Sequence, residues 1–200
     1  TVGQPALAIP RVSLLGSERT PLKLARGVWT TLEVSVENTG DADAGSVAIT
    51  GSGKGLKVRA ASTDVTRTIA STQKIRVKLR GKRKRTTLRL RVAGGGAVAT
   101  KAVKVSRFRP AAPVDGTYRD KRGKRGRVSF KVRKRTVAGF RGAVQVACGT
   151  YPQYTYSTMT IRFPKSRIGR DGIVDRTVRT RKQVLGLRLR ISGRKVTSGS

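Results

Sequence analysis

The sequence predicts an all-β protein that contains two small antiparallel β domains. Apolar residues recur at every second position in many short runs of the 200-residue chain, which is the period of a half-buried strand. Glycine-rich and Asx-rich turns separate these runs, and the first half shows no useful length of helical periodicity. A proline-bearing stretch at 108–115 divides the chain into two strand-rich parts, which favours two domains over one.

The first predicted domain covers residues 1–107. A proline-broken lead-in at 5–15 suits an edge strand, where a missing N–H group does little harm. The run at 28–37 alternates clearly and ends in the turn Asn38-Thr39-Gly40-Asp41. Further strands are expected over 47–50, 56–59, 65–69, 74–80, 86–92 and 97–105. About seven short strands of this kind favour an antiparallel sandwich of immunoglobulin type.

The run from 74 to 92 has the most distinctive charge pattern. It reads K-I-R-V-K-L-R, then G-K-R-K-R, then T-T-L-R-L-R-V, so we expect one hairpin that carries ten positive side chains. These candidate anion-binding residues are Lys74, Arg76, Lys78, Arg80, Lys82, Arg83, Lys84, Arg85, Arg89 and Arg91. The aliphatic residues between them are expected to face a core. Edge lysines also prevent unwanted sheet pairing, but ten cations exceed that need.

The stretch 108–115 is expected to be a short, stiff linker, because it is proline-bearing and weakly apolar. The second predicted domain covers 116–200. Its inward-facing sets are expected to be Val128, Phe130 and Val132; Val144, Val146 and Cys148; Ile161 and Phe163; and Leu185, Leu187, Leu189 and Ile191. This alternation predicts a second small β-sandwich or barrel.

The charge balance indicates which kinds of partner the protein attracts, and it does not indicate the fold. The chain has 45 Lys and Arg residues against 10 Asp and Glu, a formal charge of +35. Counted at Arg107, the first part has 21 bases and 6 acids and the second has 24 and 4, so each is strongly basic. Such charge attracts polymers that bear phosphate, carboxylate or sulfate, in a salt-dependent way. Arginine outnumbers lysine by 29 to 16, so compositional drift in a GC-rich genome is the alternative explanation.

The residues that most enzymes and metal sites need are scarce. The chain has no histidine and one cysteine, Cys148, which is expected to be a small buried hydrophobe. Zinc sites and histidine-based triads are therefore excluded, and we expect neither a cofactor nor catalysis. Asp41 with Asp43, and Asp171 with Asp175, are the close acid pairs. Both pairs lie in turn-like segments, where aspartate usually accepts bonds from backbone N–H groups.

Three tyrosines form the densest aromatic cluster of the sequence. Tyr151, Tyr154 and Tyr156 stand close to Pro152 in a chain with few aromatic residues. Such a loop can stack on a sugar or a base. Aromatic clusters more often cover the open end of a small core, and we prefer that interpretation.

The stretch from Arg26 to Ala44, R-G-V-W-T-T-L-E-V-S-V-E-N-T-G-D-A-D-A, resembles the CARDB type of bacterial immunoglobulin-like module. That family repeats a strand and turn of the form v-x-v-x-v-x-N-x-G. The resemblance covers roughly residues 5–107. It implies an extracellular binding or spacer module related to cell adhesion, without catalytic residues.

The second half looks like a small β domain that follows such modules in secreted proteins of high-GC bacteria. The likeness rests on the start Asp115-Gly116-Thr117-Tyr118 and on the run from Gly126 to Val132. It implies a secreted protein, and a cleaved signal peptide upstream of Thr1 would fit it.

Two functions follow as expectations. The leading one is a non-enzymatic, secreted or cell-surface β-sandwich protein with an adhesion or binding role. Its charge would attach it to anionic envelope polymers, either wall polysaccharides or lipid headgroups. The alternative is an intracellular nucleic-acid-binding protein of low sequence specificity. No apolar run approaches the roughly 20 residues that span a bilayer, so no transmembrane segment is expected.

Overall fold

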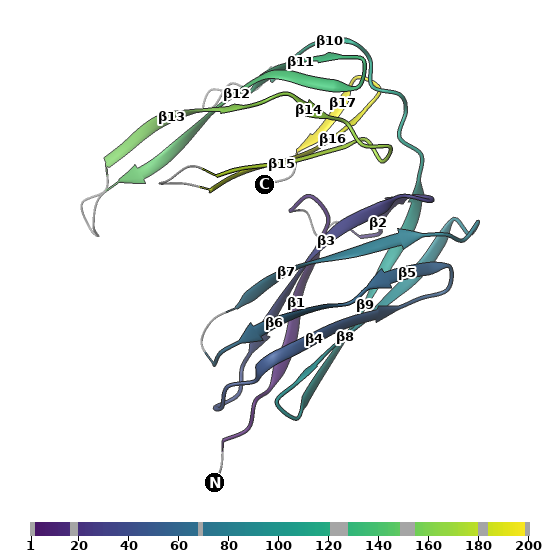
Figure 1. The fold of residues 1–200 in the computed structure, drawn as a ribbon, viewed down its shortest axis with the longest axis vertical. Coiled ribbons are helices and arrows are strands. Elements are labelled where there is room, and N and C mark those ends of the chain that lie inside the picture. The colour runs from purple at the N-terminus through teal and green to yellow at the C-terminus, as the bar shows by residue number, and fades with distance from the viewer. Residues whose placement is uncertain are drawn as a thin grey trace. The chain divides into compact units, whose positions relative to one another are not determined.

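The computed structural model describes residues 3–16, 20–67, 70–120, 128–148, 155–179 and 184–198. All regular secondary structure in these ranges is β-strand, which confirms the predicted all-β class (Figure 1). The chain forms two compact units that divide after Arg109. We call residues up to Arg109 unit 1 and residues from Pro110 onward unit 2.

Unit 1 contains two sheets. Sheet A has the order β1 (Leu7–Ser13), β3 (Trp29–Asn38), β7 (Ser71–Leu79), β5 (Leu56–Arg59). Sheet B has the order β2 (Leu22–Ala25), β9 (Ala97–Phe108), β8 (Arg85–Gly94), β4 (Gly45–Ser52), β6 (Ala61–Val65). Neighbouring strands are antiparallel except β2, which runs parallel to β9. The chain crosses repeatedly between the sheets, as in Greek-key sandwiches of immunoglobulin type.

The core of unit 1 lies between the two sheets and is aliphatic. In β3, alternate side chains from Thr30 to Asn38 are buried and those between them are partly exposed. The aliphatic residues predicted to face a core in β7 and β8 are all at most 1 % exposed. They are Ile75, Val77, Leu79, Leu88, Leu90 and Val92. The strand alternation therefore assigned the inward face of both strands correctly.

Several strand boundaries differ from the sequence prediction, and β2 was not among the predicted strands. Two of these differences change a pairing or the end of unit 1. Where a strand was expected over 65–69, the observed strand is Ala61–Val65, which pairs with β4, and residues 68–69 lie outside the described ranges. The last strand of unit 1 continues to Phe108 because residues 22–25 pair with it as far as that residue. This second difference moves the end of unit 1 into the stretch that was predicted as a linker.

Asn38 anchors the turn between β3 and β4 to the lead-in before β1. Its buried side chain accepts hydrogen bonds at Oδ1 from the N–H groups of Ala6 (3.0 Å) and Gly40 (3.1 Å). Its Nδ2 donates to the carbonyl of Ala42 at 2.7 Å. A Cβ atom at Gly40 would lie 2.4 Å from the nitrogen of Ala6, so only glycine allows this close approach. The predicted turn motif thus works by joining two separate segments.

Unit 2 also contains two sheets. Sheet C has the order β10 (Gly116–Arg119), β11 (Ser129–Arg133), β12 (Thr136–Cys148), β13 (Thr155–Phe163), and the short β14 (Ser166–Arg167) pairs with β12. Sheet D has the order β15 (Ile173–Arg179), β16 (Val184–Ser192), β17 (Lys195–Ser198). All of these pairings are antiparallel.

Four aromatic rings pack in series in the core of unit 2, among aliphatic side chains. Tyr118 and Phe130 stack with ring centroids 5.0 Å apart, and Phe130 and Phe140 follow at 5.9 Å. Phe140 meets Phe163 edge-on at 5.5 Å. Most of the predicted inward residues join this cluster, as buried or partly buried members. They are Val128, Phe130, Val132, Ile161, Phe163, Leu185, Leu187, Leu189 and Ile191. The side chains of Val144, Val146 and Cys148 lie outside what the structure describes.

Part of the predicted linker is bonded to unit 2. The N–H of Ala111 donates to Ser192 Oγ at 2.9 Å, and the N–H of Val114 donates to the carbonyl of Gly193 at 3.2 Å. The Tyr118 hydroxyl lies 2.8 Å from the carbonyl of Val114. The second half of this stretch is therefore an extended border of unit 2.

We predict that Asn38→Ala lowers the free energy of unfolding of unit 1 by about 2–3 kcal/mol, because it leaves buried backbone groups without partners. Urea denaturation followed by the fluorescence of Trp29 measures this change, since Trp29 is the one tryptophan of the chain. Thr39→Ala is the control, because it removes a single exposed bond to the carbonyl of Ala6. Equal stability of the two variants would contradict the role assigned to Asn38.

Candidate anion-binding surfaces

The predicted basic hairpin does not exist. β7 pairs with β3 and β5 in sheet A, whereas β8 pairs with β9 and β4 in sheet B. The loop at 80–84 therefore crosses from one sheet to the other. The reason is burial: the aliphatic residues of β7 and β8 face each other across the core, which two strands of one hairpin cannot do.

This crossing separates the ten candidate residues into three groups. Lys74, Arg76 and Lys78 lie on the outer face of sheet A, and Arg89 and Arg91 lie on the outer face of sheet B. The loop and its borders carry the rest at one end of the sandwich. Those residues are Arg80, Lys82, Arg83, Lys84 and Arg85. The structure thus distributes the charge over two faces and one end of unit 1.

The loop at 80–84 is held by its backbone, while its charged side chains are exposed. The N–H groups of Arg80 and Gly81 both donate to the carbonyl of Gly55, at 2.7 and 3.1 Å. Arg26 Nε donates to the carbonyl of Arg80 at 3.3 Å, and Arg107 Nη1 donates to the carbonyl of Lys82 at 3.2 Å. Sequence reasoning missed Arg26 and Arg107 because both are distant from the loop in the chain.

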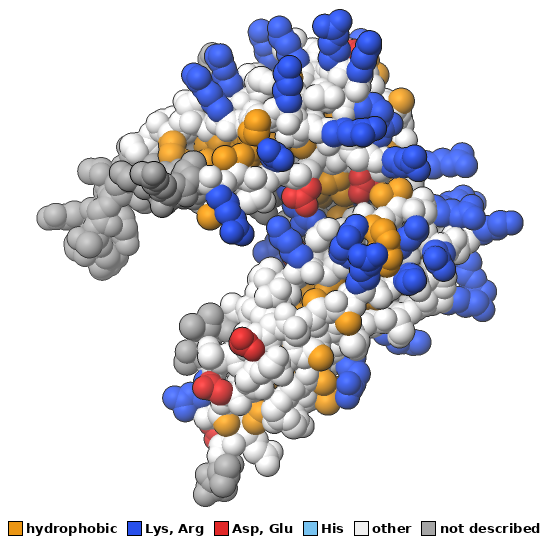
Figure 2. Space-filling model, in the orientation of Figure 1, with side chains coloured by type: hydrophobic (Ala, Val, Ile, Leu, Met, Phe, Trp, Pro, Cys, Tyr) orange, Lys and Arg blue, Asp and Glu red, His pale blue; other side chains and the backbone are white. Residues whose placement is uncertain are grey.

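Unit 1 is electrically asymmetric along its strands. Glu37, Asp41 and Asp43 lie at the Asn38 turn or beside it, and Asp64 is paired with Ser46 near the same end. The loop at 80–84 lies at the opposite end. On the face shown in Figure 2, acidic side chains of unit 1 gather toward its N-terminal end, and Lys and Arg cover the other end. A field of this kind attracts anions to the end that carries the loop.

Trp29 lies beneath several cations on the outer face of sheet A. The guanidinium carbon of Arg59 is 4.7 Å from the centroid of the Trp29 ring, and that of Arg76 is 5.7 Å away. Lys78 Nζ is 5.9 Å from the same centroid. These distances are within the range of cation–π attraction. The alternation K-V-R at 57–59 was the signal in the sequence that could have identified Arg59 as outward-facing.

Like charges stand directly opposite each other beside this ring. In the register of β5 and β7, Lys57 pairs with Lys78 and Arg59 pairs with Arg76. Among the described residues, no ion pair with an acid is found for any of these four cations. The nearest acid on the adjoining strand face is Glu33, which stands opposite Lys74. Like charges in such positions destabilise a sheet, so this surface has a cost that a bound anion would offset.

Unit 2 presents a second row of cations. Arg119, Ser129, Arg141 and Arg162 are successive cross-strand partners on four adjacent strands of sheet C. Beside them, a hollow of about 320 Å³ is lined by residues that include Thr117, Arg119, Ser129, Lys131 and Arg141. Hydroxyl groups and cations alternate in this lining. The sequence prediction had placed no site here, although the alternation of β10 to β13 points these residues outward.

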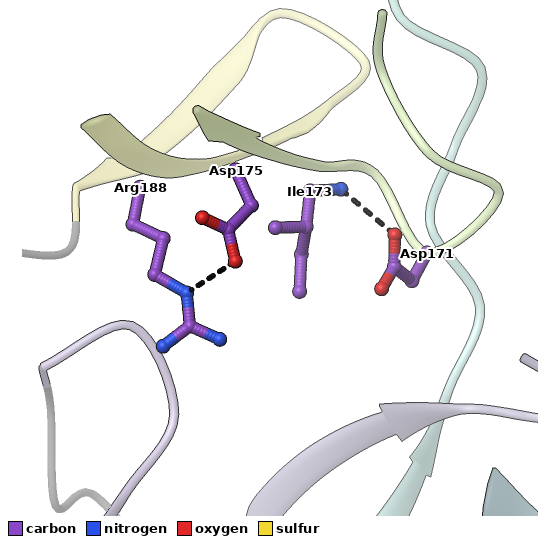
Figure 3. A network of polar contacts seen from close by, with 4 residues as sticks. All are labelled: Asp171, Ile173, Asp175 and Arg188. Atoms are coloured by element: carbon purple, nitrogen blue, oxygen red, sulfur yellow. Dashed lines mark hydrogen bonds and ion pairs between the residues drawn. The ribbon is translucent and has the colours of Figure 1, made fainter. Parts of the chain in front are cut away.

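The close acid pairs are used in local structure. Asp171 Oδ1 accepts from the N–H of Ile173 at 3.1 Å, and Asp175 Oδ2 accepts from Arg188 Nε at 3.1 Å, as Figure 3 shows. Asp175 lies in β15 and not in a turn, so that part of the prediction was wrong. Asp41 and Asp43 accept backbone bonds as expected, from the N–H groups of Gln4 and Arg67.

The remaining predictions concern the tyrosine cluster, metal sites and membrane-spanning segments. Tyr151 and Tyr154 lie outside the described residues, as does the side chain of Tyr156. The backbone of Tyr156 belongs to β13 and pairs with Ala147 of β12. In the part of the chain that the structure describes, no three His, Cys, Asp or Glu residues are placed to hold a metal ion. Within the same ranges, no helix is long and apolar enough to cross a membrane.

The fold and these surfaces define an all-β protein of two sandwich units, in which sheets A, B and C carry Lys and Arg on their outer faces. No protein-family model matches the chain, and no curated protein matches it. The resemblance to CARDB modules therefore stays a prediction that rests on the Asn38 motif.

We predict that Lys57→Glu raises the free energy of unfolding of unit 1 by about 0.5–1 kcal/mol at low salt, because it replaces a like-charge pair with an attractive one. Lys104→Glu on sheet B is the matched control, since it changes the net charge equally and its cross-strand partner is the neutral Thr87. Urea denaturation at low and at 1 M salt measures the difference. An equal gain in both variants would show that only net charge matters.

Proposed function

We propose that this protein is a non-enzymatic, secreted or cell-surface β-sandwich protein that binds anionic envelope polymers through its basic faces. The observation that carries the proposal is the basic end of unit 1, where the loop at 80–84 meets Arg26 and Arg107. The charged side chains of this loop are exposed, and the acidic residues at the Asn38 turn lie at the opposite end of unit 1. The net charge of +35 supports attraction over a long range.

The distribution of the cations favours a polymer over a small ligand. Basic side chains cover both outer faces and one end of unit 1, and sheet C of unit 2 carries a further row. A long polyanion contacts several such surfaces at once, and each contact releases counterions, so binding is strongly salt-dependent. A small anion would occupy only one of these surfaces, so it would gain much less binding free energy.

We predict that reversing the loop charges, with Lys82→Glu, Arg83→Glu, Lys84→Glu and Arg85→Glu together, weakens binding to a sulfated or carboxylated polysaccharide by about tenfold or more at low salt. The matched control reverses four exposed bases of unit 2 that lie outside sheet C, namely Lys165, Arg170, Arg194 and Lys195. Retention on polysaccharide columns, eluted by a salt gradient, measures the effect. Equal losses in the two variants would contradict the assignment to the loop.

Fractionation of native cells tests the cellular setting. Cytosol, membrane, wall and medium are separated, the wall is washed with high salt, and the protein is detected with an antibody. Release from the wall by salt is the expected result. Recovery from the cytosol with nucleic acid would overturn the proposal and make the basic faces a phosphate-binding surface of the alternative kind.

A further inference from the structure

We propose that the Trp29 patch, formed by Trp29, Lys57, Arg59, Arg76 and Lys78 on sheet A, binds tetrahedral oxyanion groups carried by a glycan chain. These groups are sulfate or phosphate esters. The inference rests on the proposed function and deepens it, because it assigns one site and one ligand chemistry within a broadly basic surface.

The register arranges the four cations of the Trp29 patch in a compact square. Arg59 and Arg76 form one row across β5 and β7, and Lys57 and Lys78 form the next. Adjacent strands are about 5 Å apart, and the rows are about 7 Å apart along the strands. Each row therefore matches one anionic group, and the two rows together match two successive groups of a linear polymer.

Trp29 acts as a positioning residue. The Arg59 guanidinium lies 4.7 Å from the ring centroid, and that of Arg76 lies 5.7 Å from it. Contact with an aromatic face restricts a guanidinium while leaving its N–H donors available to an anion. The ring therefore lowers the entropy that the two arginines lose on binding.

The paired arginines favour a tetrahedral anion over a carboxylate. A guanidinium binds two oxygens of an anion through two parallel N–H bonds. A carboxylate has two oxygens, and an arginine that binds both in that way leaves only their lateral lone pairs for a second arginine. A sulfate or phosphate monoester has three free oxygens that point in different directions, so the neighbouring guanidinium groups of Arg59 and Arg76 can both bind it.

The same geometry disfavours recognition of bases. Single-stranded nucleic acids gain affinity when bases stack on exposed aromatic rings. Three cationic groups lie within 6 Å of the Trp29 ring centroid, and that of Arg59 is the nearest. Contact with a ligand is therefore expected through charged groups, which suits a polymer without bases.

The test uses the full chain, because Trp29 is its one tryptophan and reports directly on this patch. Trp29 emission is followed during titration with a heparin oligosaccharide, and calorimetry gives an independent Kd. Inorganic sulfate and phosphate, oligogalacturonate and single-stranded DNA of equal charge are the other probes. We expect a saturable change in emission with the sulfated oligosaccharide, and weaker binding of the other probes at the same salt concentration.

Charge-conserving variants separate geometry from net charge. The double variant R59K/R76K keeps the net charge and loses the planar guanidinium groups, so binding of the heparin oligosaccharide is expected to weaken about tenfold. The double variant R176K/R179K makes the same change at two exposed arginines of β15, outside the surfaces assigned to binding, and is expected to bind as the wild type does. Trp29→Leu weakens binding in calorimetry, and Trp29→Phe restores most of it because the aromatic face is kept.

Each outcome decides between the two proposals. If R59K/R76K binds like the wild type while reversal of the loop charges weakens retention, the Trp29 patch is excluded and the proposed function stands. If the wild type binds no glycan in any form, both fail. Tighter binding of single-stranded DNA or oligogalacturonate than of the heparin oligosaccharide would overturn the ligand chemistry assigned to the patch.

Discussion

The burial of aliphatic side chains between two sheets is the constraint on which the rest of unit 1 depends. Leu32, Ile75 and Leu90 are at most 1 % exposed, and each comes from a strand whose alternate residues face solvent. Because the side-chain period of a strand is two, any cation between such residues must point outward. A chain of such high charge can therefore fold with a dry core, and its basic faces are a direct consequence of that core.

The same constraint also lowers the stability of the sheets. Outward cations on neighbouring strands become cross-strand partners, as Lys57 and Lys78 do, and their repulsion opposes folding. Cation–π contacts with Trp29 offset part of it by about 0.5–1 kcal/mol each at an exposed site. A ligand that binds only the folded protein offsets more, since binding raises stability by mass action. Stability and anion binding are therefore linked at this patch.

The alternation along each strand predicted well which side chains face the core, but it predicted poorly which strands pair with one another. It identified the inward residues of β7 and β8, and it identified the turn at Asn38. It failed for the basic hairpin, because a short turn rich in glycine and lysine fits both a hairpin and a crossing between sheets. The choice depends on which strands cover the aliphatic face of β7, and those are β3 and β5, which are distant in the chain.

The sequence by itself determined the all-β class, the direction in which the alternating side chains of β3, β7 and β8 point, and the strong positive charge, because these depend on residue type and on a period of two. Only the tertiary structure decided that Trp29 lies beside Arg59 and Arg76, and that Arg26 and Arg107 bind the loop at 80–84. These contacts join strands that are far apart in the chain. Pairing of that kind depends on how the whole core closes, which no local window of sequence contains.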